Sequence, residues 1–148
     1  MADTDTSVIN FLLRVLPLDT PRFTNLALKH ILNWWKGEMT GMECSTHIAE
    51  SIIMTTATRT CCHLPKDSPE VDALANYLYD HIFCFPKEEA VKRAYDFMGL
   101  STSASDTDVN EADFNLFLKY HPVGGGSVHD YYKLHSCVTL IKVARGEY

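Results

Sequence analysis

The chain has 148 residues, of which 46% are hydrophobic and 22% are charged. These proportions are typical of one globular domain and exclude an intrinsically disordered chain. The formal net charge of −6 and the scatter of the 13 lysine and arginine residues argue against nucleic-acid binding, because that function needs a basic face. We therefore expect a single domain over residues 1–148.

The amino-terminal residues and the cysteines indicate the compartment. Acidic residues precede the first apolar stretch, whereas a secretory signal begins with positive charge. No stretch approaches the roughly 20 apolar residues that a membrane-spanning helix requires. The five cysteines are an odd number at irregular spacing, which is unlike a disulfide framework. We expect a soluble protein of the cytosol or the nucleus.

Helical periodicity is clear in the first quarter of the chain. Residues 7–16 place their apolar side chains on one face. A second helix is expected to begin at Pro21 and to be closed by Gly37 and Gly41. This second helix is apolar on nearly all sides, which is typical of a helix at the centre of a domain or at an interface.

Three further helices are expected in the middle of the chain. The first runs from Ser45 to about Thr58, the second opens at Pro69, and the third opens at Pro86 and ends before Gly99. The residues expected to face inward on the second of these are Val71, Leu74, Ala75, Leu78, Ile82 and Phe85.

The last third of the chain is less regular. Residues 100–108 are small, polar and acidic, and predict a mobile loop before a helix over 110–120. Glycines make residues 123–126 a hinge. The tail reads as a helix at first, but residues 137–143 are rich in β-branched side chains; we favour helix because a lone strand has no partner. The prediction is an all-α fold of six or seven helices in a compact bundle or orthogonal helical array.

A calcium loop is the first candidate site. Asp106, Asp108 and Asn110 occupy its first, third and fifth positions. However, Glu111 replaces the required glycine and Phe117 replaces the bidentate glutamate. Helix capping by short polar residues explains the same pattern, and we favour capping.

A zinc site is the second candidate. Cys44 and His47 are three residues apart, and so are His81 and Cys84. On an α-helix this spacing puts both members of a pair on one face, and two pairs would supply a tetrahedral site. Residues 61–63 add two cysteines and a histidine. Buried thiols beside partly exposed histidines are the alternative, so zinc stays a minority hypothesis and no cofactor is expected.

A cysteine enzyme is the third candidate. Cys137 has His135, His129 and His121 nearby in sequence, which are the residue types of a thiol nucleophile and its base. No oxyanion motif accompanies them, and the glycines at 124–126 lack the lysine of a phosphate loop. We expect no catalytic residue.

Adjacent aromatic residues point to binding. Trp34 and Trp35 are neighbours on a helix and therefore point about 100° apart, so one core cannot take both. Tyr131 and Tyr132 repeat the pattern. Exposed tryptophan and tyrosine side chains are favoured anchors at protein interfaces. The alternative is that a small bundle buries both tryptophans from different sides.

Two segments resemble Bcl-2-like apoptosis regulators of the divergent viral type. Residues 8–13 are similar to the family's first helix, and residues 74–82 are similar to a later one. The spacing of a BH3 segment is kept by Leu28, Leu32, Trp35 and Met39. The family's Asn-Trp-Gly-Arg signature has no counterpart where it should occur. The resemblance implies an apolar groove that binds an amphipathic helix of a partner protein.

The sequence therefore predicts a non-enzymatic, regulatory protein–protein interaction module, with self-association into a homodimer as one form of that function. The residues expected to bind the partner are Leu28, Leu32, Trp34, Trp35 and Tyr77. A zinc-stabilised helical protein and a small cysteine enzyme remain the alternatives.

Overall fold

The computed structural model describes residues 26–56, 69–121 and 125–147. These residues form six helices and no strand, with η1 continuing α3. The elements are the helical segment 26–35, α2 (Gly41–Thr56), α3 (Pro69–Leu78), the π-helical turn η1 (Tyr79–Phe83), α4 (Lys87–Phe97), α5 (Asp106–Tyr120) and α6 (Val128–Ala144). The expected all-α bundle is confirmed. The helix expected over 7–16 and the turn near 61–63 lie outside the described residues.

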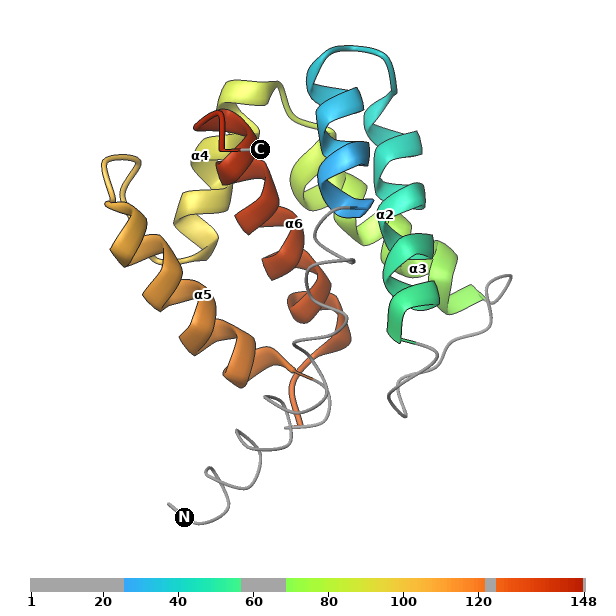
Figure 1. Ribbon diagram of the computed structural model, residues 1–148. Coiled ribbons are helices and arrows are strands. Elements are labelled where there is room, and N and C mark those ends of the chain that lie inside the picture. Colours follow the sequence, from blue (N-terminus) through green and yellow to red (C-terminus); the bar gives the residue numbers. More distant parts are fainter. Residues whose placement is uncertain (1–25, 57–68, 122–124, 148) are drawn as a thin grey trace.

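The carboxy-terminal helix α6 runs through the middle of the bundle, with α4 and α5 on one side and the segment 26–35 and α2 on the other (Figure 1). It contacts α2, α3, α4 and α5. Of its 17 residues ten are buried. Because neighbours cover α6 on several sides, its β-branched residues pack well in a helix, and the ambiguity over 137–143 is resolved as helix.

The segment 26–35 is not the central helix. Ala27 and Ile31 are fully buried. Leu28, Leu32, Trp34 and Trp35 are half-buried and lie against the core. Gly37 ends the segment as expected, with a φ of 80° that favours glycine.

The start of α2 corrects two predictions. Gly41 does not close the preceding helix, and α2 begins there rather than at Ser45. The Thr40 hydroxyl accepts a hydrogen bond from the Glu43 N–H (3.2 Å), and the Glu43 carboxylate accepts one from the Thr40 N–H (3.1 Å). This reciprocal capping fixes the helix start. A Cβ atom on Gly41 would lie 2.1 Å from the Phe83 carbonyl oxygen, so glycine lets α2 approach η1.

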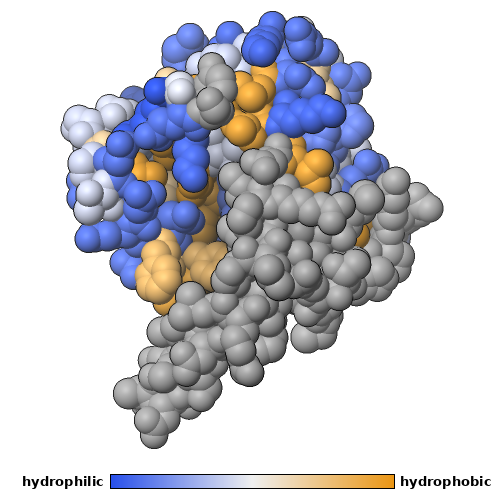
Figure 2. All heavy atoms as spheres, in the orientation of Figure 1, coloured by the Kyte–Doolittle hydropathy of each residue, from blue (hydrophilic) through white to orange (hydrophobic). Residues whose placement is uncertain are grey.

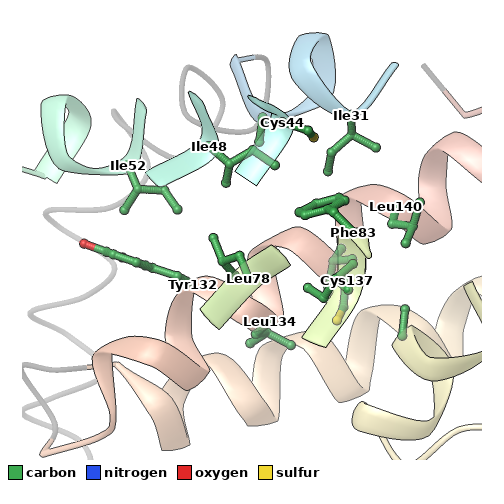
Figure 3. Packing of buried hydrophobic residues seen from close by; sticks show 14 of the residues in the cluster. Ile31, Cys44, Ile48, Ile52, Leu78, Phe83, Tyr132, Leu134, Cys137 and Leu140 are labelled. Carbon is green, nitrogen blue, oxygen red and sulfur yellow. The ribbon is translucent and has the colours of Figure 1, made fainter. Parts of the chain in front are cut away.

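The core lies between these layers. Of the six residues expected to face inward, the five on α3 and η1 are buried, and Phe85, which follows η1, is half-buried. In Figure 3, Leu78 and Phe83 project between Ile31 and Ile48 on one side and α6 on the other. The largest fully buried side chains are Ile31, Cys44, Ile48, Ile52, Leu74, Leu78, Ile82, Tyr132, Leu134, Cys137, Leu140 and Ile141.

The helix α5 begins earlier than expected, at Asp106 instead of Asn110. Ser105 and Asp108 cap it reciprocally, so the connection between α4 and α5 is shorter than 100–108. Within the described residues no helix has the length and apolar character needed to cross a membrane. In Figure 2 most described side chains on the visible face are hydrophilic, and hydrophobic atoms show between α5 and α6.

Candidate functional site: a half-buried helix face

The two tryptophans have different surroundings. The Trp34 ring meets the Phe83 ring edge-on, with centroids 5.1 Å apart. The Trp35 ring lies 6.4 Å from that of Trp34, and the Lys87 ammonium lies 5.2 Å from the Trp35 centroid. Both tryptophans are half-buried, so part of each ring stays accessible. Because Trp34 contacts Phe83 and Trp35 contacts Lys87, different residues of the bundle cover the two rings.

Three apolar side chains form one stripe along the segment 26–35. Leu28, Leu32 and Trp35 are four and three residues apart, which places them on one helix face. All three are half-buried and rest on the core. They lie beside the fully buried pair Ala27 and Ile31. We call Leu28, Leu32 and Trp35 the half-buried stripe.

The fifth residue expected to bind a partner, Tyr77, contacts a different set of residues. Its hydroxyl donates a hydrogen bond to Asp130 Oδ1 (3.3 Å), and its ring lies 4.1 Å from the His81 ring and 4.9 Å from the His129 ring. Burial and the neighbouring Asp130 raise the pKa of Tyr77 to about 12. Tyr77 therefore belongs to a group built by α3, η1 and α6, apart from the stripe.

A second group was not expected from the sequence. The Lys133 ammonium lies 4.5 Å from the Phe97 ring centroid and 6.0 Å from that of Tyr77. Phe97 stacks on Tyr120 at 5.8 Å, and the Lys119 ammonium lies 5.4 Å from the Tyr120 centroid. We call Tyr77, Lys133, Phe97, Tyr120 and Lys119 the cation–aromatic array. It joins α3, α6, α4 and α5, so no local sequence pattern could reveal it.

The four zinc candidates do not come together. Cys44 is buried, and burial raises the pKa of its thiol. Cys84 is exposed and donates to the Asp80 carbonyl (3.2 Å), while His81 Nδ1 bonds the Tyr77 carbonyl (2.8 Å). The backbone of η1 forms hydrogen bonds between residues i and i+5, so its turn is wider than that of an α-helix. Two residues three positions apart, such as His81 and Cys84, therefore do not lie on one face. Across the described ranges, no three His, Cys, Asp or Glu side chains could hold a metal ion.

The fourth zinc candidate takes part in a histidine pair. The His47 ring stacks on His30 with centroids 5.0 Å apart and an interplanar angle of 12°. Its Nδ1 lies 4.0 Å from a Glu50 carboxylate oxygen. His47 is exposed whereas Cys44 is buried, so this pair does not share one environment.

Cys137 lacks the environment of a nucleophile. It is buried in the core, and burial raises the pKa of its thiol to about 12, so the thiol stays protonated near neutral pH. His135 is two residues away on the same helix and so points to another side. Burial lowers the pKa values of His135 and His121 to about 4. His129 contacts Tyr77 instead.

The residues of the calcium pattern serve the start of α5. Asp108 caps the helix with Ser105, and Asp106 pairs with Arg145 Nη1 at 2.5 Å. The expectation of capping is therefore confirmed for Asp108.

No protein-family model, curated protein or solved structure matches the chain. The resemblance to Bcl-2-like regulators therefore stays a prediction. One of its segments, 74–82, lies on α3 and η1, while 8–13 is outside the described residues.

Proposed function

We propose that this protein is a non-enzymatic regulatory module that binds an amphipathic helix of a partner protein along the half-buried stripe. The observation that carries the proposal is the continuous apolar face of Leu28, Leu32 and Trp35, which rests on the core and stays partly uncovered. An amphipathic partner helix presents apolar anchors along one face and packs that face against an apolar surface of this kind.

The stripe has the physical properties of an interface. Its side chains are held by the buried residues beneath them, so little freedom is lost when a partner binds. Trp35 offers a large apolar ring whose remaining exposed area a partner helix would cover. Tryptophan is among the residues that contribute most to binding energy at interfaces.

The finer proposal is that the partner is a BH3-type helix, as for Bcl-2-like regulators of apoptosis. It is supported by the resemblance of 74–82 and by the spacing of Leu28, Leu32, Trp35 and Met39.

The test measures binding of fluorescein-labelled BH3-type peptides by fluorescence anisotropy. We expect saturable binding that Leu32→Glu weakens at least about tenfold, which corresponds to about 1.4 kcal/mol. Met42→Glu is the matched control, since Met42 is 44% exposed on α2 and lies outside the stripe. Binding that both variants weaken equally would contradict the site. If no peptide binds, and sedimentation shows a concentration-independent monomer, the proposed function is wrong.

A further inference from the structure

We propose that the cation–aromatic array is a second binding surface and that it takes an acidic peptide segment of a protein partner. This inference concerns residues outside the half-buried stripe and stands whether or not that stripe binds a helix.

The array fixes the positions of two ammonium groups. Lys133 lies over the rings of Phe97 and Tyr77, and Lys119 lies over Tyr120. Ring faces attract cations, so each long side chain is held in place before a ligand arrives. A cation that is already ordered loses less side-chain entropy when it pairs with a carboxylate.

Both ammonium groups are available for pairing. Within the residues that the structure describes, neither Lys119 nor Lys133 takes part in an ion pair. The Asp130 carboxylate, which contacts the array, accepts a hydrogen bond from the Tyr77 hydroxyl. His81 and His129 flank the Tyr77 ring and add polar groups at that end of the array. The array is thus a cationic surface on a chain whose net charge is −6.

The overall charge selects the occupant. Nucleic acid and anionic membranes present extended negative charge, which the rest of an acidic protein repels. The rings of the array already stack on one another or on lysines, so they are poorly placed to stack on bases. A short acidic peptide carries less charge over a smaller area, so this repulsion is weaker for it, and its carboxylates can pair with the two lysines.

The test uses a labelled Glu-rich peptide and the same peptide with Gln at every Glu position. We expect the Glu-rich peptide to bind and the Gln peptide to bind at least about tenfold more weakly, as close charge pairs across interfaces predict. The double variant Lys119→Gln/Lys133→Gln should lose about tenfold in affinity, and rising salt should weaken binding. Lys36→Gln/Lys92→Gln removes the same charge from exposed positions outside the array and should bind within about twofold of the original chain.

Lys133→Arg keeps the cation over the rings and should retain binding, which separates loss of charge from loss of fold. Thermal unfolding of each variant checks that the fold is intact. The proposal is overturned if the two double variants lose affinity equally, if the Gln peptide binds as well as the Glu-rich one, or if single-stranded DNA or phosphatidylserine vesicles bind more tightly than the peptide.

Discussion

His121 and His135 lie where α5 meets α6, among the aromatic rings of Phe117 and Tyr131. The Tyr131 ring is 4.9 Å from that of His121 and 4.7 Å from that of His135, and Phe117 lies 5.5 Å and 6.0 Å from them. Burial lowers the pKa of His121. Burial is also the main reason for the lowered pKa of His135, and the charges of His121 and Lys142 lower it further. Both histidines are therefore neutral in the folded protein near neutral pH.

This pair predicts loss of stability in mild acid. The pKa of each histidine is about 6.5 in the unfolded chain and about 4 in the folded one, so the unfolded chain binds more protons between these values. The free energy of unfolding should fall as the pH drops from about 6.5 to about 4, by up to about 3 kcal/mol for each histidine. Urea denaturation followed by circular dichroism across this range measures the slope.

The carboxylates contribute to the same slope, so the comparison between variants isolates the histidines. Half-buried Asp113 acts in the opposite direction: burial raises its pKa, against the Lys142 charge, so the folded protein binds the proton more tightly and gains stability as the pH falls. His135→Gln should flatten the pH dependence by roughly half of the histidine contribution. Exposed His81→Gln should leave it unchanged. A slope that is the same in all three proteins would refute the explanation.

Among the elements, the junction of α4, α5 and α6 depends on one side chain. Arg145 caps α6 and donates to the Tyr95 hydroxyl (2.9 Å), to Asp106 Oδ1 (2.5 Å) and to the Ala104 carbonyl (2.5 Å). The hydrogen bond that Arg145 donates to the Tyr95 hydroxyl raises the pKa of Arg145, and the hydrogen bond to Asp106 raises it further. A planar guanidinium can reach three acceptors in this way, whereas a lysine ammonium cannot match the geometry.

We expect Arg145→Lys to lower the free energy of unfolding by about 1–3 kcal/mol, because hydrogen bonds to a charged group are lost, one of them to the hydroxyl of the buried Tyr95. Chemical denaturation measures the change. Arg93→Lys is the control: Arg93 forms an exposed pair with Glu89, and such pairs contribute less than about 1 kcal/mol. Equal effects of the two variants would show that Arg145 does not join the three helices.

At the scale of the whole molecule, stability depends on the central helix. Leu140 is fully buried in α6, which contacts most of the other helices. Leu140→Ala should cost about 2–5 kcal/mol through lost burial and a residual cavity. Because these helices share one core, tryptophan fluorescence and circular dichroism should report the same transition midpoint.

Phe114 provides the comparison for that variant. Its side chain is 50% exposed on α5, so Phe114→Ala should change the free energy of unfolding by no more than about 0.5 kcal/mol. Separate midpoints for the two probes, or a Leu140→Ala cost as small as that of Phe114→Ala, would disprove the central role of α6.

The sequence alone determined the fold class and most helix positions. The apolar periodicity of α3 and the helix boundaries marked by Pro86 and Gly99 depend on local chemistry. The structure places the buried face of α3 and both ends of α4 where they were expected. The starts of α2 and α5 were also encoded locally, since Thr40 with Glu43 and Ser105 with Asp108 are capping pairs. In each pair the two residues are three positions apart, as in a capping box.

Only the tertiary structure decided which helix is central and which candidate residues meet. The tail of the chain is helical because neighbours cover α6 on several sides, which no pattern within 137–143 reveals. The π-turn η1 separates His81 from Cys84, and it packs closely against α2 at Gly41. Tyr77 does not lie beside the other predicted partner-binding residues, because it contacts α6. The residue of α6 that it bonds, Asp130, is about fifty residues further along the chain. Periodicity reports which face of a helix is apolar, whereas the partner of that face is fixed by long-range packing.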